Sequence, residues 1–172
     1  TKRPTNRDNT RKDLCCAKFR REYEPATKKN KNMTSINFPI LKYSDVLLML
    51  AEAENEVNGP AAAYTYINEV RRRAGISDLP EGLSQDEFRN KIKDERAKEM
   101  CFELIRRYDL IRWGDYIQSM NEQVSRANSG RNWNQGSQVA SFFAIPERYN
   151  YFPIPDSEKA VNKLITGNNP GW

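Results

Sequence analysis

Histidine is absent from the 172 residues of this chain. Its absence excludes serine–histidine and cysteine–histidine catalysis and histidine-ligated metal sites, and it removes the commonest general base at neutral pH. A glycine-rich motif of the kind that cradles phosphate groups is missing as well. These absences remove the commonest catalytic arrangements, and the sequence indicates neither a metal nor a cofactor.

Cysteine is scarce, and the three that occur are Cys15, Cys16 and Cys101. An odd number without the Cys-x-x-Cys spacing predicts neither a zinc site nor a disulfide framework. Cys15 and Cys16 are adjacent, and a disulfide between neighbours strains the peptide bond that joins them. The sequence assigns no role to these three residues.

Long apolar runs are also missing. The longest, Val46–Ala51, has six residues, whereas a membrane-spanning helix needs about 18 or more. Hydrophobic residues make up 38% of the chain and charged residues 30%. This composition predicts a hydrophilic domain whose 172 residues are enough for a real core.

Positive charge is concentrated near the N-terminus, although the whole chain carries only +5. Residues 1–34 are predicted to form a basic polar segment, partly extended or disordered, ahead of a domain at 35–172. One interpretation is an arm that binds nucleic acid or an anionic surface. The other is a solvated segment, which we favour because no aromatic residues of a nucleic-acid module accompany the charge. We therefore expect no nucleic-acid partner.

Helical periodicity begins at Lys42. The range Lys42–Val57 is apolar on two sides, which is typical of a helix packed between others. Its main apolar face comprises Tyr43, Val46, Leu47, Leu50, Ala53 and Val57. Asn58-Gly59-Pro60 should end this helix and start another over Ala61–Ala74, and so short a connection makes the two antiparallel. The hairpin resembles one tetratricopeptide-type repeat.

A capping box at Ser84–Glu87 predicts the start of a long helix that reaches about Gln123, with a break near Gly114. Charged residues fall within its apolar stripe and must be paired, because a lone buried charge costs several kcal/mol, roughly. The predicted ion network comprises Arg96, Glu99, Glu103, Arg106, Asp109 and Arg112. A pair of carboxylates for glycoside hydrolysis is the alternative, but the surrounding arginines would keep these carboxylates ionised.

Sugar recognition has one good candidate, the loop around Trp133. A flat aromatic ring flanked by Asn132, Asn134 and Gln135 offers an apolar face together with amide donors and acceptors. The aromatic residues near the FPIP segment, Tyr149, Tyr151 and Phe152, could also stack on sugar rings. We expect these three to pack within the domain or at its edge.

Four segments in order carry a resemblance to a known family. They are LKYSDVLLMLAEAENEVNGP (41–60), INEVRRRAGI (67–76), ERAKEMCFELIRRYDLIRWGDY (95–116) and YFPIPDSEKAVNKLITGNNPGW (151–172). Together they resemble the C-terminal part of the SusD/RagB family of nutrient-binding outer-membrane lipoproteins. Leu104 stands where the family pattern has glycine, and Asn168 where it has glutamine. These departures do not change the class of protein that the four segments indicate.

The resemblance implies a mostly α fold, with the tetratricopeptide-like hairpin packed on the long helix and irregular loops elsewhere. It implies a cell-surface subunit without catalytic activity that captures glycans or other nutrients and works with a TonB-dependent outer-membrane transporter. Family members are about three times longer, so the chain is expected to be a C-terminal fragment or a truncated member. A helical-repeat scaffold that binds protein and no glycan, and a basic nucleic-acid binder, remain as alternatives.

Overall fold

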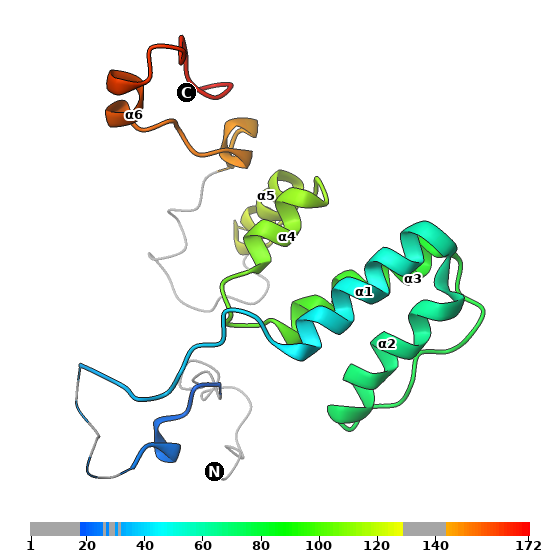
Figure 1. Ribbon diagram of the computed structural model, residues 1–172. Coiled ribbons are helices and arrows are strands. Elements are labelled where there is room, and N and C mark those ends of the chain that lie inside the picture. Colours follow the sequence, from blue (N-terminus) through cyan, green and yellow to red (C-terminus); the bar gives the residue numbers. More distant parts are fainter. Residues whose placement is uncertain (1–17, 26, 28–29, 31, 129–143) are drawn as a thin grey trace. The chain divides into compact units, whose positions relative to one another are not determined.

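The computed structural model describes residues 18–25, 27, 30, 32–128 and 144–172 (Figure 1). Every regular element in these ranges is helical, which confirms the mostly α class. The chain divides into two compact units, residues 1–103 and 104–172. The predicted boundary after residue 34 stays a prediction.

The first unit is built on a helical hairpin. Helix α1 spans Tyr43–Asn58 and α2 spans Pro60–Arg73, so both lie within one residue of the predicted bounds. Gly59 joins them with φ of 83°, a value that favours glycine, and Pro60 occupies the first turn of α2. Figure 1 shows α1 and α2 side by side and antiparallel, as predicted.

Helix α3, Gln85–Glu99, closes this unit by packing on the hairpin. The capping box is present, because the Ser84 side chain accepts from the Glu87 amide and Glu87 accepts from the Ser84 amide. The core that the three helices share consists of Leu47, Leu48, Ala51, Ala63, Ile67, Val70, Phe88 and Ile92. Reciprocal hydrogen bonds between Asn55 and Gln85 tie the end of α1 to the start of α3.

One expectation for α1 is only half met. Its buried apolar residues, Leu47, Leu48 and Ala51, belong to the side covered by α2 and α3. The opposite side, which contains Tyr43 and Leu50, is exposed in the described structure. The two-sided pattern therefore predicted a helix with two neighbours correctly, but much of its main apolar face is uncovered.

The long helix predicted to reach Gln123 is in fact three helices. Helix α3 ends at Glu99, α4 spans Arg106–Arg112, and α5 spans Tyr116–Asn128 after a turn at Gly114. The unpredicted break at 100–105 contains Phe102 and Leu104, with φ of 66° and 64°. These left-handed residues turn the chain out of the helix, so Glu103 and Arg106 do not continue the stripe of α3.

Leu104→Gly is expected to raise the free energy of unfolding by about 0.5–1 kcal/mol. A left-handed conformation costs a side-chain-bearing residue roughly 1–2 kcal/mol, and the added flexibility of glycine in the unfolded chain offsets part of that gain. Leu104 is 82% exposed, so the substitution removes little packing. Urea unfolding should show the gain for Leu104→Gly and no comparable gain for Leu104→Ala. Equal stabilities of the two variants would mean that this backbone carries no strain.

The second unit contains α4, α5, the 3₁₀ helix η5 at Glu147–Asn150 and the short α6 at Asp156–Val161. Helix α5 packs on both α4 and η5. Asn121 on α5 exchanges two hydrogen bonds with the backbone of Ile145. Within the described ranges, none of the helices combines the length and the apolar composition that a membrane-spanning segment needs.

Candidate functional site

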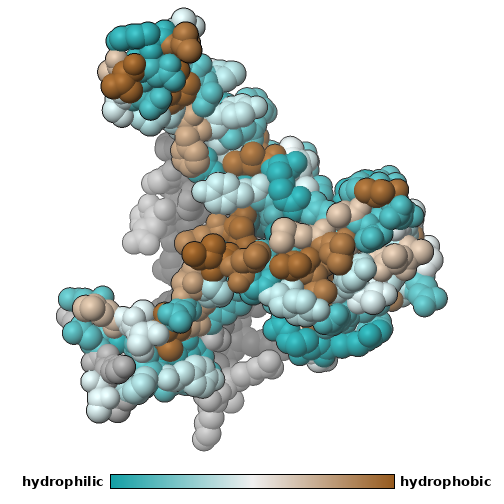
Figure 2. Space-filling model, in the orientation of Figure 1, coloured by the Kyte–Doolittle hydropathy of each residue, from teal (hydrophilic) through white to brown (hydrophobic). Residues whose placement is uncertain are grey.

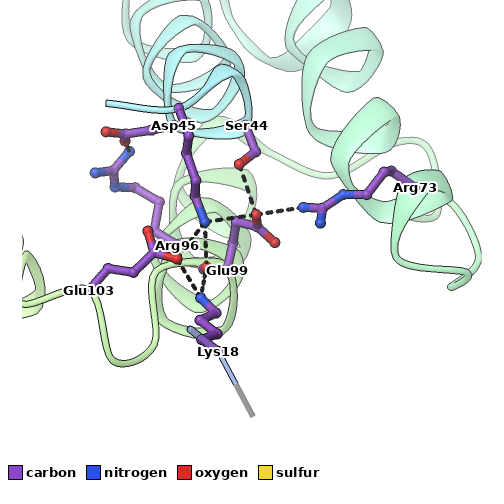
Figure 3. A network of polar contacts seen from close by, with 8 residues as sticks. Lys18, Ser44, Asp45, Arg73, Arg96, Glu99 and Glu103 are labelled. Atoms are coloured by element: carbon purple, nitrogen blue, oxygen red, sulfur yellow. Dashed lines mark hydrogen bonds and ion pairs between the residues drawn. The ribbon is translucent and has the colours of Figure 1, made fainter. Parts of the chain in front are cut away.

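The C-terminal end of α3 and the residues that follow it form a dense polar cluster (Figure 3). The Lys42 ammonium lies between two carboxylates, 3.0 Å from Glu99 Oε1 and 2.7 Å from Glu103 Oε1. Lys18 reaches the same Glu103 oxygen at 2.6 Å. Both lysines also donate to the main-chain carbonyl of Glu99, so the cluster satisfies one of the carbonyls at the helix end.

Glu99 has two further partners on the hairpin. The Ser44 hydroxyl donates to Oε1 at 2.8 Å, and the Arg73 guanidinium at 2.5 Å. The cluster thus joins the start of α1, the end of α2 and the end of α3.

Both carboxyl groups are held in their ionised form. Burial alone would raise the pKa of Glu99, but hydrogen bonds from Ser44, Lys42 and Arg73 outweigh it and lower that pKa. Burial likewise opposes ionisation of Glu103, and the bonds from Lys18 and Lys42 reverse the effect and lower its pKa. A carboxyl group with a lowered pKa does not donate a proton at neutral pH, so this geometry does not suit a general acid.

Arg96 lies deeper than the cluster and has a different partner. Its guanidinium donates to Asp45 Oδ1 at 2.8 Å, and the Arg96 side chain is only 4% exposed. The neighbouring Glu95, also buried, accepts from Arg71 at 2.6 Å. Each of these ion pairs links α3 to one helix of the hairpin. Within the described ranges, no group of three or more cysteine or acidic side chains could hold a metal ion.

The six residues of the predicted ion network are divided between the two units. Arg96, Glu99 and Glu103 belong to the first unit, but each is paired with a residue from outside the predicted set. The other three lie on α4 in the second unit, where Arg112 donates to Asp109 at 3.0 Å. The guanidinium groups of Arg106 and Arg112 lie 5.5 Å and 4.7 Å from the centre of the Trp113 ring.

Sequence reasoning missed the partners of the acidic residues. It expected nearby arginines to neutralise these carboxylates. The partners of Glu103 in the structure are Lys42 and Lys18, which are 61 and 85 residues away from it in the sequence. A signal for Lys42 existed, because it directly precedes the hairpin that was expected to pack on this helix. No comparable signal pointed to Lys18.

The predicted sugar-binding residues Trp133, Asn132, Asn134 and Gln135 lie outside the described residues. Before that loop, an exposed groove on α5 is lined by Gln118, Asn121, Glu122 and Ser125. These side chains present amide, hydroxyl and carboxylate groups, the types that hydrogen-bond to sugar hydroxyls.

Several aromatic residues of the second unit contact arginines or one another. The Arg107 guanidinium lies 4.3 Å from the centre of the Phe152 ring and donates to the carbonyl of Tyr149. The Tyr149 and Trp172 rings meet edge to face at 5.5 Å. Phe152 and Tyr149 therefore make intramolecular contacts, although Phe152 is 58% exposed and the third aromatic of this group, Tyr151, is 53% exposed.

Comparison with known proteins places the whole chain in one group. Residues 1–172 match the sequence profile of the SusD family. SusD-like protein P25 of Formosa agariphila is 39% identical over 134 residues, which are 76% of this chain and 23% of that protein. The starch-binding protein SusD of Bacteroides thetaiotaomicron is 30% identical over 132 residues, 77% of this chain and 21% of that protein.

A solved structure agrees with the sequence matches. The crystal structure of a SusD homolog from Bacteroides thetaiotaomicron superimposes with a TM-score of 0.69 at 35% identity, over 80% of this chain and 27% of that one. The chain thus spans about a quarter of the length of the relatives that it matches. On the sequence profile, the relatives and the fold together, this chain belongs to the SusD family.

Proposed function

We propose that this chain forms part of a cell-surface protein of the outer membrane that binds glycans or related nutrients and delivers them to a TonB-dependent transporter. The observation that carries the proposal is membership of the SusD family over residues 1–172. One relative is itself a starch-binding protein, which makes a glycan the first ligand to test.

The proposed sugar contacts within this chain are Trp133 and its neighbours Asn132, Asn134 and Gln135. Stacking on an indole ring and hydrogen bonds from amides are the usual means of holding a sugar ring. The loop follows α5 in the sequence, and the groove on α5 has polar groups of a compatible kind. Because the matched relatives are about four times as long, most ligand contacts are proposed to come from elsewhere in such a protein.

Binding rather than hydrolysis is the proposed activity. Glu99 and Glu103, the best-placed pair of acidic residues, are held ionised by lysine, arginine and serine donors. Such pairs stabilise structure and leave no protonated carboxyl group to act on a glycosidic oxygen.

Isothermal titration calorimetry on the 172-residue chain tests the location of the ligand site. Maltoheptaose and a panel of other oligosaccharides are expected to bind with a Kd no tighter than about 1 mM, near 4 kcal/mol of binding free energy. A reducing-sugar assay run in parallel should detect no product. Micromolar binding that Trp133→Ala abolishes would show that this chain carries the main recognition site. Turnover that Glu99→Gln abolishes in a folded protein would contradict a binding role.

The transporter partnership has a separate test. The tagged protein, expressed in its own host, is expected to co-purify with a TonB-dependent transporter from detergent-solubilised outer membranes. Recovery from a soluble fraction with no such transporter would contradict the proposal, whatever the glycan affinity.

A protein-binding scaffold is the second candidate function, and one observation favours it. Helix α1 exposes apolar side chains on the side that faces away from its two neighbours. Exposed apolar stripes on helices are typical of protein contacts, whereas sugar sites use aromatic rings together with polar groups. A scaffold would bind protein through this face and show no affinity for any oligosaccharide in the panel.

A further inference from the structure

The turn between α1 and α2 contains the only asparagine–glycine pair in the sequence, Asn58-Gly59. Asn58 is the last residue of α1, and Gly59 has already left the helix, with φ of 83° and ψ of 178°. Asn58 is exposed to solvent. Figure 2 shows hydrophilic surface beside hydrophobic surface where α1 leads into α2. The turn therefore places an exposed side-chain amide next to a main-chain nitrogen that no neighbouring side chain shields.

An asparagine that precedes a glycine can react with its own main chain. The Gly59 nitrogen attacks Cγ of Asn58, a bond between these two atoms forms, and the bond from Cγ to Nδ2 breaks. Ammonia leaves, carrying the proton that the Gly59 nitrogen gives up, and a succinimide ring remains. Water then opens the ring at either of its carbonyl carbons, which produces aspartate or isoaspartate. The reaction requires water and no oxidant, metal or second protein.

The surroundings of Gly59 leave room for the ring. Glycine has no Cβ to hinder attack by its nitrogen. In the described structure, a Cβ built at Gly59 would have no heavy atom within 4 Å apart from its chain neighbours. Ring formation at this turn would therefore displace no packed side chain.

Two hydrogen bonds oppose the reaction in the folded turn. The Gly59 N–H donates to the Asn55 carbonyl at 3.1 Å, which occupies the attacking nitrogen. Asn58 Nδ2 donates to Glu54 Oε2 at 2.8 Å, which holds the amide toward the preceding turn of α1. Both bonds lie in the last turn of a helix, where ends fray and local opening costs little free energy. The bonds should therefore slow the reaction without preventing it.

The product carries a negative charge in an unfavourable position. Glu54 precedes Asn58 by four residues, so the hydrogen bond between them would become a contact of two like charges. The last turn of α1 contains no basic residue, and a negative charge at a helix C-terminus opposes the helix dipole. In isoaspartate the main chain also runs through the former side chain and is longer by one CH₂. The Gly59 N–H would then no longer align with the Asn55 carbonyl.

We propose that Asn58 is a site of spontaneous deamidation and that the modification loosens the turn between α1 and α2. Gly59 is the only residue between the two helices, so the turn has no spare length to absorb a longer main chain. The reactants are the chain itself and water, so the proposal stands apart from the proposed binding function.

Peptide mapping of the aged 172-residue chain tests the location of the site. The chain is incubated at mildly alkaline pH and digested with trypsin, and the peptides are analysed by tandem mass spectrometry and by labelling with isoaspartyl methyltransferase. Conversion at Asn58 is expected to exceed conversion at Asn37 at least tenfold. Asn37 is the matched control because it is exposed too but precedes Phe38. Equal conversion at the two asparagines would overturn the proposal.

Two variants test the chemistry and the restraint. Asn58→Gln keeps an amide on a longer side chain, which disfavours ring closure, and should lower conversion at this position at least tenfold. Glu54→Ala removes the acceptor that holds the Asn58 amide and should raise conversion at least twofold, with the fold checked by circular dichroism. Unchanged conversion in Asn58→Gln would contradict a succinimide route. Slower conversion in Glu54→Ala would contradict a restraining role for Glu54.

Urea unfolding measures the consequence for the turn. Asn58→Asp reproduces the aspartate product, and its unfolding midpoint is expected at a lower urea concentration than that of the neutral Asn58→Gln. Aged chain enriched in isoaspartate should unfold at a lower concentration still. The control Asn37→Asp adds the same charge outside a helix and should keep the parent midpoint. A midpoint of Asn58→Asp equal to that of Asn58→Gln would overturn the inference that the modification loosens the turn.

Discussion

Arg96→Ala is expected to lower the free energy of unfolding by about 3–5 kcal/mol, the usual cost of removing one partner of a buried ion pair. Arg96 and Asp45 are both buried, and their side chains meet at 2.8 Å between α3 and α1. Without the guanidinium, the Asp45 carboxylate would remain in a site that water reaches poorly. Urea unfolding followed by circular dichroism measures the loss.

The matched control is Arg89→Ala, on the same helix. Arg89 also bridges α3 to α1, through Glu56, but the pair is much more open to solvent. An exposed pair of this kind contributes about 1 kcal/mol or less. Equal losses for Arg96→Ala and Arg89→Ala would show that burial of the Arg96 pair has no energetic consequence.

Glu103→Ala should destabilise the chain by about 3 kcal/mol, because it removes the carboxylate shared by two lysines. Lys42 keeps its contact with Glu99, whereas Lys18 loses the Glu103 carboxylate and keeps its hydrogen bond to the Glu99 carbonyl. A loss below roughly 0.5 kcal/mol would mean that the cluster behaves like an exposed surface pair.

The pH dependence of the free energy of unfolding gives a second measure of how much the same cluster stabilises the fold. Glu99 and Glu103 have lower pKa values in the folded chain than the ordinary value of 4.5. Their contribution is therefore fully present above about pH 4.5 and is lost as the pH falls through their folded pKa values. Glu103→Gln should flatten this acid-side decrease relative to the parent chain. An unchanged pH profile would contradict the lowered pKa of Glu103.

The hairpin and the start of α3 were predictable because their signals are local. Periodicity located α1 and α2, Gly59 and Pro60 located the turn between them, and the capping box located Ser84. Each signal acts within a few residues of the feature that it specifies.

The break after α3 was not predictable in the same way. Residues 100–105 contain neither glycine nor proline, and their apolar spacing continues the helical pattern. Two left-handed residues at Phe102 and Leu104 end the helix, and such strain persists only where tertiary contacts impose it. The one sequence signal was the family pattern, in which glycine stands at the position of Leu104.

The need for charged partners in the polar cluster was predictable from the sequence, but the identity of those partners was not. Charged residues at buried positions of a helix require partners, and the structure pairs Arg96 with Asp45, Glu99 with Lys42 and Glu103 with Lys18. Their partners come from distant parts of the chain, and no spacing rule connects Asp45 to Arg96 or Lys18 to Glu103. The proposed sugar contacts around Trp133 stay a prediction.

The long sequence separation between Lys18 and Glu103 also predicts the order in which the contacts of the first unit form during folding. Helices α1, α2 and α3 follow one another directly, so their contacts close short loops, whereas the bond from Lys18 to Glu103 closes a loop of 85 residues. Short loops lose less chain entropy on closing and form faster. The three helices should therefore form first as a folding nucleus, and the segment at Lys18 should join last and detach first.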